Sequence, residues 1–145
     1  FITGNTDAMG GAVSAERKSC VVVTYDGSSL SSGIKIYVNG ISLTVTGAGT
    51  LSATTAGTAP LNIGARNSTD RFFSGEVSDV QIISGRALTQ ADATRINSTF
   101  KSGLPKAYDT GQVVAHYNWR YNGRDRSGNG NDLTPANSPI IKRTR

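Results

Sequence analysis

The sequence contains very few residues that support cross-linking or catalysis: one Cys, one His, one Trp and one Met among 145 residues. A single Cys excludes an internal disulfide, so the fold depends on packing alone. A lone thiol is less usual in a secreted domain of this size than in a protein assembled in a reducing cytoplasm. No apolar run reaches the length of a membrane span, and none resembles the core of a signal peptide. The chain therefore predicts one packed domain without membrane insertion.

Common catalytic patterns are also missing. The sequence has no G-x-S-x-G, G-x-x-x-x-G-K-[ST] or G-x-G-x-x-G pattern, which argues against a serine-hydrolase elbow and a phosphate-binding loop. A Cys/His pair would need Cys20 beside His116, but Cys20 opens a β-branched run and is expected to be a small core residue. Glu76 and Asp79 are three residues apart and fall on opposite faces of a strand, which does not suit a glycosidase. We therefore expect a protein that is not an enzyme.

Positive charge is concentrated in the last third of the chain. Residues 1–100 hold seven basic and seven acidic side chains, whereas residues 101–145 hold eight basic and three acidic ones, so the net charge of +5 lies there. A basic end can contact phosphate, nucleic acid or an acidic protein surface. Because the bases are spread out and no nucleic-acid-binding motif accompanies them, a solvated end is preferred and nucleic acid is not an expected partner.

Short apolar runs among many Gly, Ser and Thr residues predict an all-β protein. Alternation is clearest at 34–46, where Asn39 and Gly40 supply the two positive-φ positions of a type I′ hairpin turn. Thr89 and Asp92 have the spacing of a capping box, which predicts a short helix within 89–100. The predicted strands are 21–25, 34–39, 41–46, 61–64, 76–83 and 112–119.

Five segments together carry a resemblance to a known fold family. They are "VVVTYDGSS" (21–29), "IKIYVNG" (34–40), "LNIGAR" (61–66), "RFFSGEVSDVQIISGRALTQAD" (71–92) and "VAHYNW…RDRSGNGNDLT" (114–134). The chain resembles the laminin-G-like, concanavalin A-like jelly-roll family. The resemblance implies a two-sheet antiparallel sandwich, here with one short helix near 89–100. It also implies binding of glycans or proteins at one rim or face, in many members with a structural Ca²⁺.

The last of these segments is displaced relative to the family pattern. It normally opens such a domain, but here it follows the closing "SGRAL" segment. A circular permutant, a section of a tandem array and a sandwich completed by a neighbouring chain all fit this order. Because the chain begins at Phe1 rather than Met, we expect a processed product, a fragment, or numbering from the first ordered residue. We divide it into a main sandwich part, 1–105, and a part that completes this sandwich or a neighbour's, 106–145.

The stretch "DRSGNGNDLTP" at 125–135 has two interpretations. Asp125 and Asn129, with backbone carbonyls, are candidate ligands for Ca²⁺, which is the one cofactor that the sequence suggests. An EF-hand does not fit, because the position that needs a bidentate Glu is Ala136. The preferred interpretation is a tight turn without a cofactor, in which Gly128 and Gly130 adopt positive φ.

Aromatic and basic side chains at the end of the last predicted strand form a candidate ligand-binding strip. Its members are Tyr117, Trp119, Tyr121, Arg120 and Arg124. The three aromatic residues are spaced two apart and share one face of a strand, where rings can stack on sugars. The alternative is a row of rings that face the core, and it is preferred because Val113 and Ala115 share that face.

Two function classes stay open. The first is a non-catalytic surface recognition module that binds a glycan or a cell surface within a larger assembly such as a phage virion. The second is a structural subunit, a capsid decoration, fibre or filament protein, that assembles by strand exchange. Both predict an oligomer or larger assembly in an extracellular or virion-surface location. The expected assembly arm combines apolar and basic residues near the C-terminal end: Ile140, Ile141, Lys142, Arg143 and Arg145.

Overall fold

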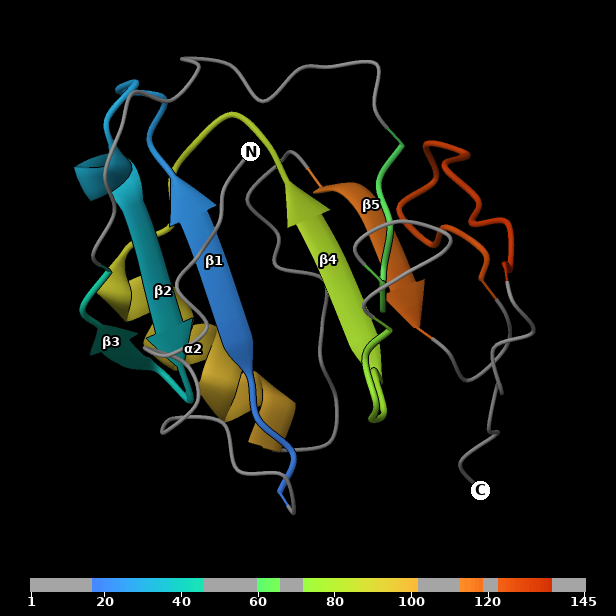
Figure 1. Ribbon diagram of the computed structural model, residues 1–145, viewed down its shortest axis with the longest axis horizontal. Helices are drawn as coiled ribbons and strands as arrows, with labels where there is room; N and C mark the ends of the chain where they lie inside the picture. Colours follow the sequence, from blue (N-terminus) through green and yellow to red (C-terminus); the bar gives the residue numbers. More distant parts are fainter. Residues whose placement is uncertain (1–16, 46–59, 66–71, 102–112, 119–122, 137–145) are drawn as a thin grey trace. The chain divides into compact units, whose positions relative to one another are not determined.

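The structure is a computed structural model that describes residues 17–45, 60–65, 72–101, 113–118 and 123–136. Its elements, in chain order, are β1 (Val21–Tyr25), the 3-10 helix η1 (Ser31–Gly33), β2 (Ile34–Val38), β3 (Ile41–Leu43), β4 (Asp79–Ile83), α2 (Gln90–Lys101) and β5 (Val113–Asn118) (Figure 1). The described part of the chain is mostly β, with two antiparallel sheets and one α-helix, which confirms the predicted class. No helix among the described residues is long and apolar enough to cross a membrane.

The chain forms two compact units. The first contains residues 1–57 and 86–106, and the second contains residues 58–85 and 107–145. The first unit therefore holds β1, β2, β3 and α2, whereas the second holds β4 and β5. The division expected from the sequence, at residue 105, stays a prediction.

A three-stranded sheet in the order β1-β2-β3 forms the frame of the first unit. Val22 lies opposite Tyr37 in the register of β1 and β2, so both side chains project from the same face of the sheet. That face packs against the helix through a buried cluster with two partly buried neighbours: Cys20, Val22, Tyr37, Ala93, Leu88 and Ile96. Cys20 is a free thiol that is 9% exposed, which confirms its predicted place in the core.

The turn between β2 and β3 docks the helix. Asn39 and Gly40 have φ values of 53° and 80°, so the predicted positive-φ hairpin turn is confirmed. A Cβ atom at Gly40 would lie 3.2 Å from the Cα of Thr94, so glycine also allows the helix to approach closely. The side-chain amide of Asn97 donates a hydrogen bond of 2.9 Å to the carbonyl of Asn39. The hairpin and α2 are therefore fixed to one another by backbone and side-chain contacts.

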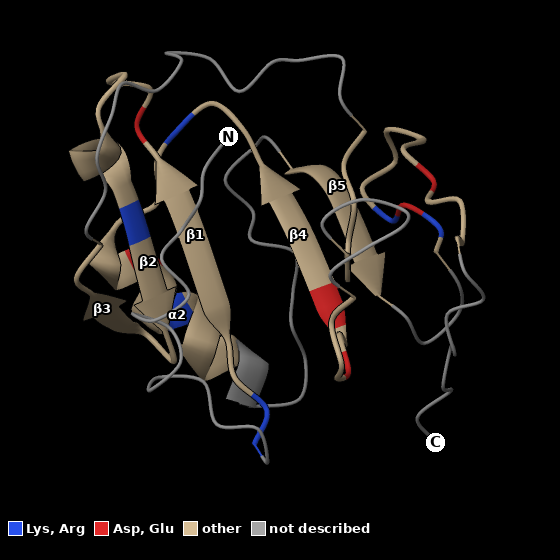
Figure 2. Ribbon diagram, viewed as in Figure 1, with Lys and Arg blue, Asp and Glu red and all other residues tan. Residues whose placement is uncertain are grey.

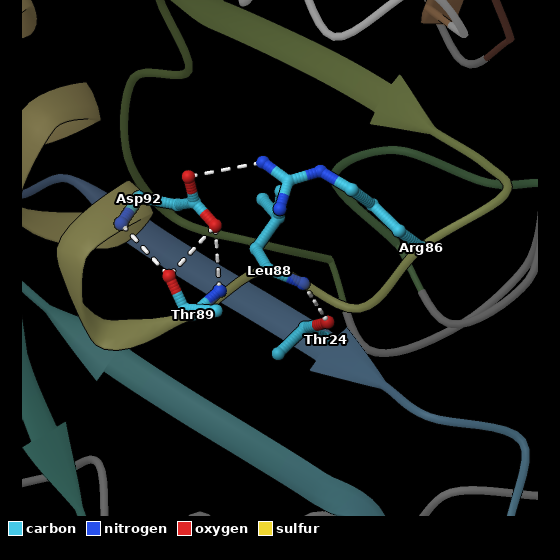
Figure 3. Close-up of polar contacts among 5 residues, drawn as sticks. All are labelled: Thr24, Arg86, Leu88, Thr89 and Asp92. Carbon is cyan, nitrogen blue, oxygen red and sulfur yellow. Dashed lines mark hydrogen bonds and ion pairs between the residues drawn. The ribbon is translucent and has the colours of Figure 1, made fainter.

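The capping box at the start of α2 is formed as predicted, and Figure 3 shows its contacts. Thr89 donates its backbone N–H to Asp92 Oδ2 at 2.8 Å, and the backbone N–H of Asp92 is 3.3 Å from Thr89 Oγ1. Arg86 forms an ion pair of 3.0 Å with the same carboxylate. The neighbouring N–H of Leu88 donates to the hydroxyl of Thr24 on β1 at 2.9 Å, which ties the start of the helix to the sheet.

The second unit contains the antiparallel pair β4 and β5. Val80 lies opposite Tyr117 and Ile82 lies opposite Ala115, so one face of this pair is apolar. The other face is polar, because Asp79 and Gln81 on β4 lie opposite Asn118 and His116 on β5. The displaced C-terminal segment therefore pairs with β4 of its own chain.

Three predicted strands differ from the observed ones by more than one residue at an end. The predicted strand 61–64 is wrong: these residues form no strand, Leu61 is 58% exposed, and Gly64 has a φ of 82°, far from the values of a regular β-strand. The second hairpin strand ends at Leu43 rather than at 46. The strand predicted from 76 begins at Asp79, because the three preceding residues are exposed and make no ladder pairs. Alternation was too weak a signal to fix the extent of the strand at each of these places.

Replacing Asp92 with Ala tests the helix cap. The change removes the acceptor of the Thr89 N–H and the partner of Arg86, so we expect the free energy of unfolding to fall by about 1–2 kcal/mol in urea denaturation. The control is Ser98→Ala, a change at an exposed site on the same helix, which should alter stability by less than about 0.5 kcal/mol. Equal losses in the two variants would show that the cap contributes nothing specific.

Candidate functional site

The segment 123–133 folds against the edge of β5 that does not pair with β4. The backbone N–H of His116 donates to Asp125 Oδ1 at 3.0 Å, and the N–H of Arg126 donates to the carbonyl of His116 at 2.8 Å. Asp125 also forms an isolated antiparallel bridge with Tyr117. An uncovered strand edge presents unpaired N–H and C=O groups, which favours pairing with other chains. In this protein the segment 123–133 of the same chain supplies hydrogen-bond partners for N–H and C=O groups on that edge.

The carboxylate of Asp125 organises the loop. Besides the N–H of His116, it accepts the backbone N–H and the hydroxyl of Ser127 at 2.8 Å each, and the N–H of Asn131 at 3.0 Å. A carboxylate offers about four acceptor positions, so these four donors use all of them. One side chain thus joins three separate parts of the chain: the strand, the turn and the far end of the loop.

These contacts also fix the charge state of Asp125. Burial raises the pKa of this carboxyl, but hydrogen bonds from His116, Ser127 and Asn131 lower it more strongly, to about 2 from an ordinary value of 3.8. Asp125 is therefore ionised throughout the neutral range. Its own backbone N–H donates to Asp132 Oδ1 at 2.8 Å, so a second carboxylate closes the loop from the opposite end.

Two side-chain amides complete the cover of the strand edge. Asn129 donates to the carbonyl of Val113 at 2.9 Å, and Asn131 donates to the carbonyl of Val114 at 2.9 Å. Gly128 and Gly130 have φ values of 92° and 76°, so the predicted turn with two positive-φ glycines is confirmed. A Cβ at either glycine would meet no atom within 4 Å, so the backbone conformation and not space requires glycine there.

An open hollow of about 620 Å³ lies beside this loop. Its lining combines two carboxylates, two guanidinium groups, one amide and two glycines: Asn118, Arg124, Asp125, Arg126, Gly128, Gly130 and Asp132. Basic and acidic residues alternate along the segment that follows β5, as the colours in Figure 2 show. We call this feature the loop hollow. Every residue that lines it belongs to the second unit.

A largely buried hydrogen-bonded pair lies on the polar face of β4 and β5. His116 Nε2 is 3.1 Å from Asp79 Oδ2, and the two side chains are 10% and 13% exposed. Gln81 Nε2 lies 3.4 Å from the other carboxylate oxygen. Sequence reasoning missed this pair, because the two residues are 37 positions apart and only the strand register brings them together.

The predicted binding strip is only partly described by the structure. Tyr117 is 3% exposed and donates its hydroxyl to the carbonyl of Asn131 at 2.7 Å, so its ring presents no face to solvent. Burial raises the pKa of Tyr117, and the nearby negative charges of Asp125 and Asp132 raise it further. Arg124 lines the loop hollow. The remaining predicted site residues lie outside the described residues: Trp119, Arg120, Tyr121, Ile140, Ile141, Lys142, Arg143 and Arg145.

The predicted calcium ligands act as hydrogen-bonding groups in this structure. Every acceptor position of Asp125 has a donor, and the side-chain amide of Asn129 donates to backbone carbonyls. Among the described residues, no three His, Cys, Asp or Glu side chains gather where they could hold a metal ion. The calcium site stays a prediction.

Comparison with known families shows to which superfamily the chain belongs. A model of the concanavalin A-like lectin/glucanases superfamily matches residues 3–94, which is more than half of the chain. The chain belongs to this superfamily. The resemblance noted in the sequence is thereby confirmed, and the two antiparallel sheets agree with the sandwich architecture that it implies. The matched residues include β1 to β4 and the start of α2, whereas β5 and the loop hollow follow them. No curated protein and no solved structure matches the chain.

The low pKa of Asp125 predicts acid sensitivity. A carboxyl whose pKa is depressed by folding stabilises the folded state above its unfolded value, and that contribution is lost as the pH falls from about 4 through about 2. We expect Asp125→Asn to lower the free energy of unfolding by about 2 kcal/mol at pH 7, because the donors from His116, Ser127 and Asn131 would face a neutral amide with one acceptor oxygen in place of a charged carboxylate. Urea denaturation should also show a shallower loss of stability between pH 4 and 2 in the variant. Identical pH profiles for the variant and the wild type would contradict this role.

Proposed function

We propose that this chain is a non-catalytic carbohydrate-binding module and that the loop hollow is its binding site. One observation carries the proposal: a chain of the lectin/glucanases superfamily places a polar hollow beside a loop whose geometry is fixed by hydrogen bonds. A rigid backbone holds the lining residues in place before a ligand arrives, so little ordering entropy is lost on binding.

The lining of the loop hollow suits a ligand rich in hydroxyl groups. A sugar hydroxyl both donates and accepts hydrogen bonds, and the lining offers both kinds of partner. Arg124 and Arg126 are donors, Asp132 is an acceptor, and Asn118 is both. The volume of about 620 Å³ lies within the range of small-molecule sites, but the charged lining disfavours an apolar ligand.

The ionisation of Asp125 supports binding without catalysis. Glycoside hydrolysis needs a carboxyl that is protonated near neutral pH to act as the general acid, and enzymes obtain it by raising a pKa. Hydrogen bonds lower the pKa of Asp125 instead, to about 2. Glu76, one of the two acids that the sequence analysis weighed for a glycosidase, is exposed and precedes β4, outside the ladder that pairs β4 with β5.

The proposed setting is an outer surface, either extracellular or on a virion, within an oligomer or larger assembly. Laminin-G-like domains are usually extracellular, which supports this location. The carbohydrate would then belong to a cell surface, and the module would supply attachment while other parts of the assembly supply the remaining functions.

One observation favours the alternative of a structural subunit. The sheet face opposite α2 carries Val21, Val23 and Ile41, which are 42%, 57% and 69% exposed. Val21 and Ile41 both lie opposite Val38 in the register, so they share one face of the sheet, on which Val38 itself is buried at 3% exposure. Exposed apolar surfaces of this kind are typical of contacts between proteins.

A glycan array with the purified chain separates the two functions. We expect saturable binding to a subset of glycans, and a loss of about fivefold in affinity for Asn118→Ala, the value of about one hydrogen bond. The control is Lys35→Ala, an exposed site on β2 in the other unit, which should leave binding unchanged. A blank array together with a stable oligomer in light scattering would reject carbohydrate binding and favour the structural function.

A further inference from the structure

We propose that the outer edge of β1 is an interface, and that it pairs with β1 of a second copy of this chain in an antiparallel, two-fold arrangement centred on Val22. The inference does not depend on carbohydrate binding. It is carried by three features of the first unit: backbone groups that point away from β2, exposed valines beside them, and opposite charges on the two sides of the strand.

The direction of the backbone groups in β1 follows from the hydrogen bonds at its two ends. The N–H of Asn39 donates to the carbonyl of Cys20 at 2.8 Å, and the N–H of Asp26 likewise bonds across the hairpin at 3.3 Å. Because successive residues of a strand turn these groups to opposite sides, Val21 and Val23 turn theirs away from β2. Within the described residues no strand pairs with β1 on that side, where β1 ends the sheet.

β1 lacks the protection that the other sheet edges have. The outer edge of β5 is met by the segment 123–133, β3 has only three residues, and β4 begins with the charged Asp79. Short length, charge and proline are the usual features that keep an edge strand from pairing with another chain. β1 has five residues, and none of them is charged, Gly or Pro. Its edge therefore suits pairing with another strand.

A two-fold axis at Val22 makes this edge complementary to itself. Val21 of one copy then faces Val23 of the other, and both turn their N–H and C=O groups toward the partner, so backbone hydrogen bonds form at each of these pairs. The side chains of Val21 and Val23 lie on the sheet face opposite α2, where they are 42% and 57% exposed. Cross-strand neighbours contact one another, so dimerisation removes apolar surface of both valines from water.

The charged residues beside β1 favour the same register. Lys18 and Asp26 lie four positions before and after Val22, so the two-fold arrangement places Lys18 of one copy opposite Asp26 of the other. Both side chains are exposed. Hydrogen bonds from the hydroxyl and the backbone N–H of Ser28 hold the pKa of Asp26 below its ordinary value of 3.8, so this carboxylate is charged at neutral pH. Opposite charges that face each other across a ladder are stabilising, and another register would separate them.

Sedimentation velocity of the full chain measures the association. A contact along one strand edge is smaller than the interfaces of permanent dimers, so we expect a monomer–dimer equilibrium with a dissociation constant of roughly 10–100 μM. The sedimentation coefficient should rise from the monomer value toward the dimer value between about 5 μM and about 500 μM chain. A coefficient that stays at the monomer value over this whole range would overturn the proposal.

Charge reversal tests the register. Lys18→Glu and Asp26→Lys each place like charges opposite one another at both symmetric contacts, so each variant should associate with itself about tenfold more weakly. An equimolar mixture of the two variants restores opposite charges at both contacts and should associate within about threefold of the wild type. The control, Lys35→Glu, makes the same charge change at an exposed site on β2 and should leave association unchanged. Equal weakening by the control, or no recovery in a mixture of variants that melt like the wild type, would reject the proposed pairing.

Amide hydrogen exchange of the wild type identifies the strand without any substitution. The amides of Val21 and Val23 should exchange at least about threefold more slowly at about 500 μM than at about 5 μM, whereas those of Val22 and Thr24, which face β2, should not change. If the chain dimerises but Val21 and Val23 exchange equally at both concentrations, the interface lies elsewhere. If these two amides are equally protected at both concentrations in a chain that stays monomeric, the chain covers its own edge. Either result would overturn the proposal.

Discussion

The outer edge of β5 imposes the main constraint on the second unit. A strand edge buried by other chain segments must have its N–H and C=O groups paired, and an exposed one invites association with other chains. In this protein one carboxylate, that of Asp125, accepts the N–H of His116 on that edge and also holds Ser127 and Asn131. The conformation of the loop and the hollow beside it both depend on this arrangement.

In the first unit, too, a carboxylate accepts a backbone N–H, at the start of α2. Asp92 accepts the N–H of Thr89 and pairs with Arg86, as Asp125 accepts backbone donors in the second unit. A chain with one Cys has no internal disulfide to hold its loops. Carboxylates that accept backbone N–H groups hold local structure in both units, because charge-assisted hydrogen bonds are stronger than neutral ones. For Asp125 the cost is sensitivity to acid, since protonation of this carboxylate removes its advantage as an acceptor.

The features that the sequence predicted well are those set by local backbone chemistry. Positive φ values in the hairpin turn and in the loop are set by the local turn and do not depend on how the rest of the chain folds. The residues concerned are Asn39, Gly40, Gly128 and Gly130. The strand predicted at 61–64 was wrong because a segment of four residues that ends in a positive-φ glycine is too short to show a reliable alternation of apolar and polar residues. Two features could not be predicted, because both depend on the register of β5 against its neighbours. They are the contact between Asp79 and His116, and the set of hydrogen bonds that Asp125 accepts. Family membership supports the sandwich and the binding of carbohydrate, but the matched residues end before the loop hollow begins.

Amide hydrogen exchange tests the central claim most directly, namely that Asp125 holds the loop on β5. The wild type and Asp125→Ala are compared at neutral pH, with the amides of Val22 and Tyr37 in the other unit as internal references. The account predicts that the amides of His116, Ser127 and Asn131 exchange at least about tenfold faster in the variant, because each loses its acceptor, while the reference amides are unchanged. Retained protection of the His116 amide in the variant would show that something other than this carboxylate holds the edge, and the account would be wrong.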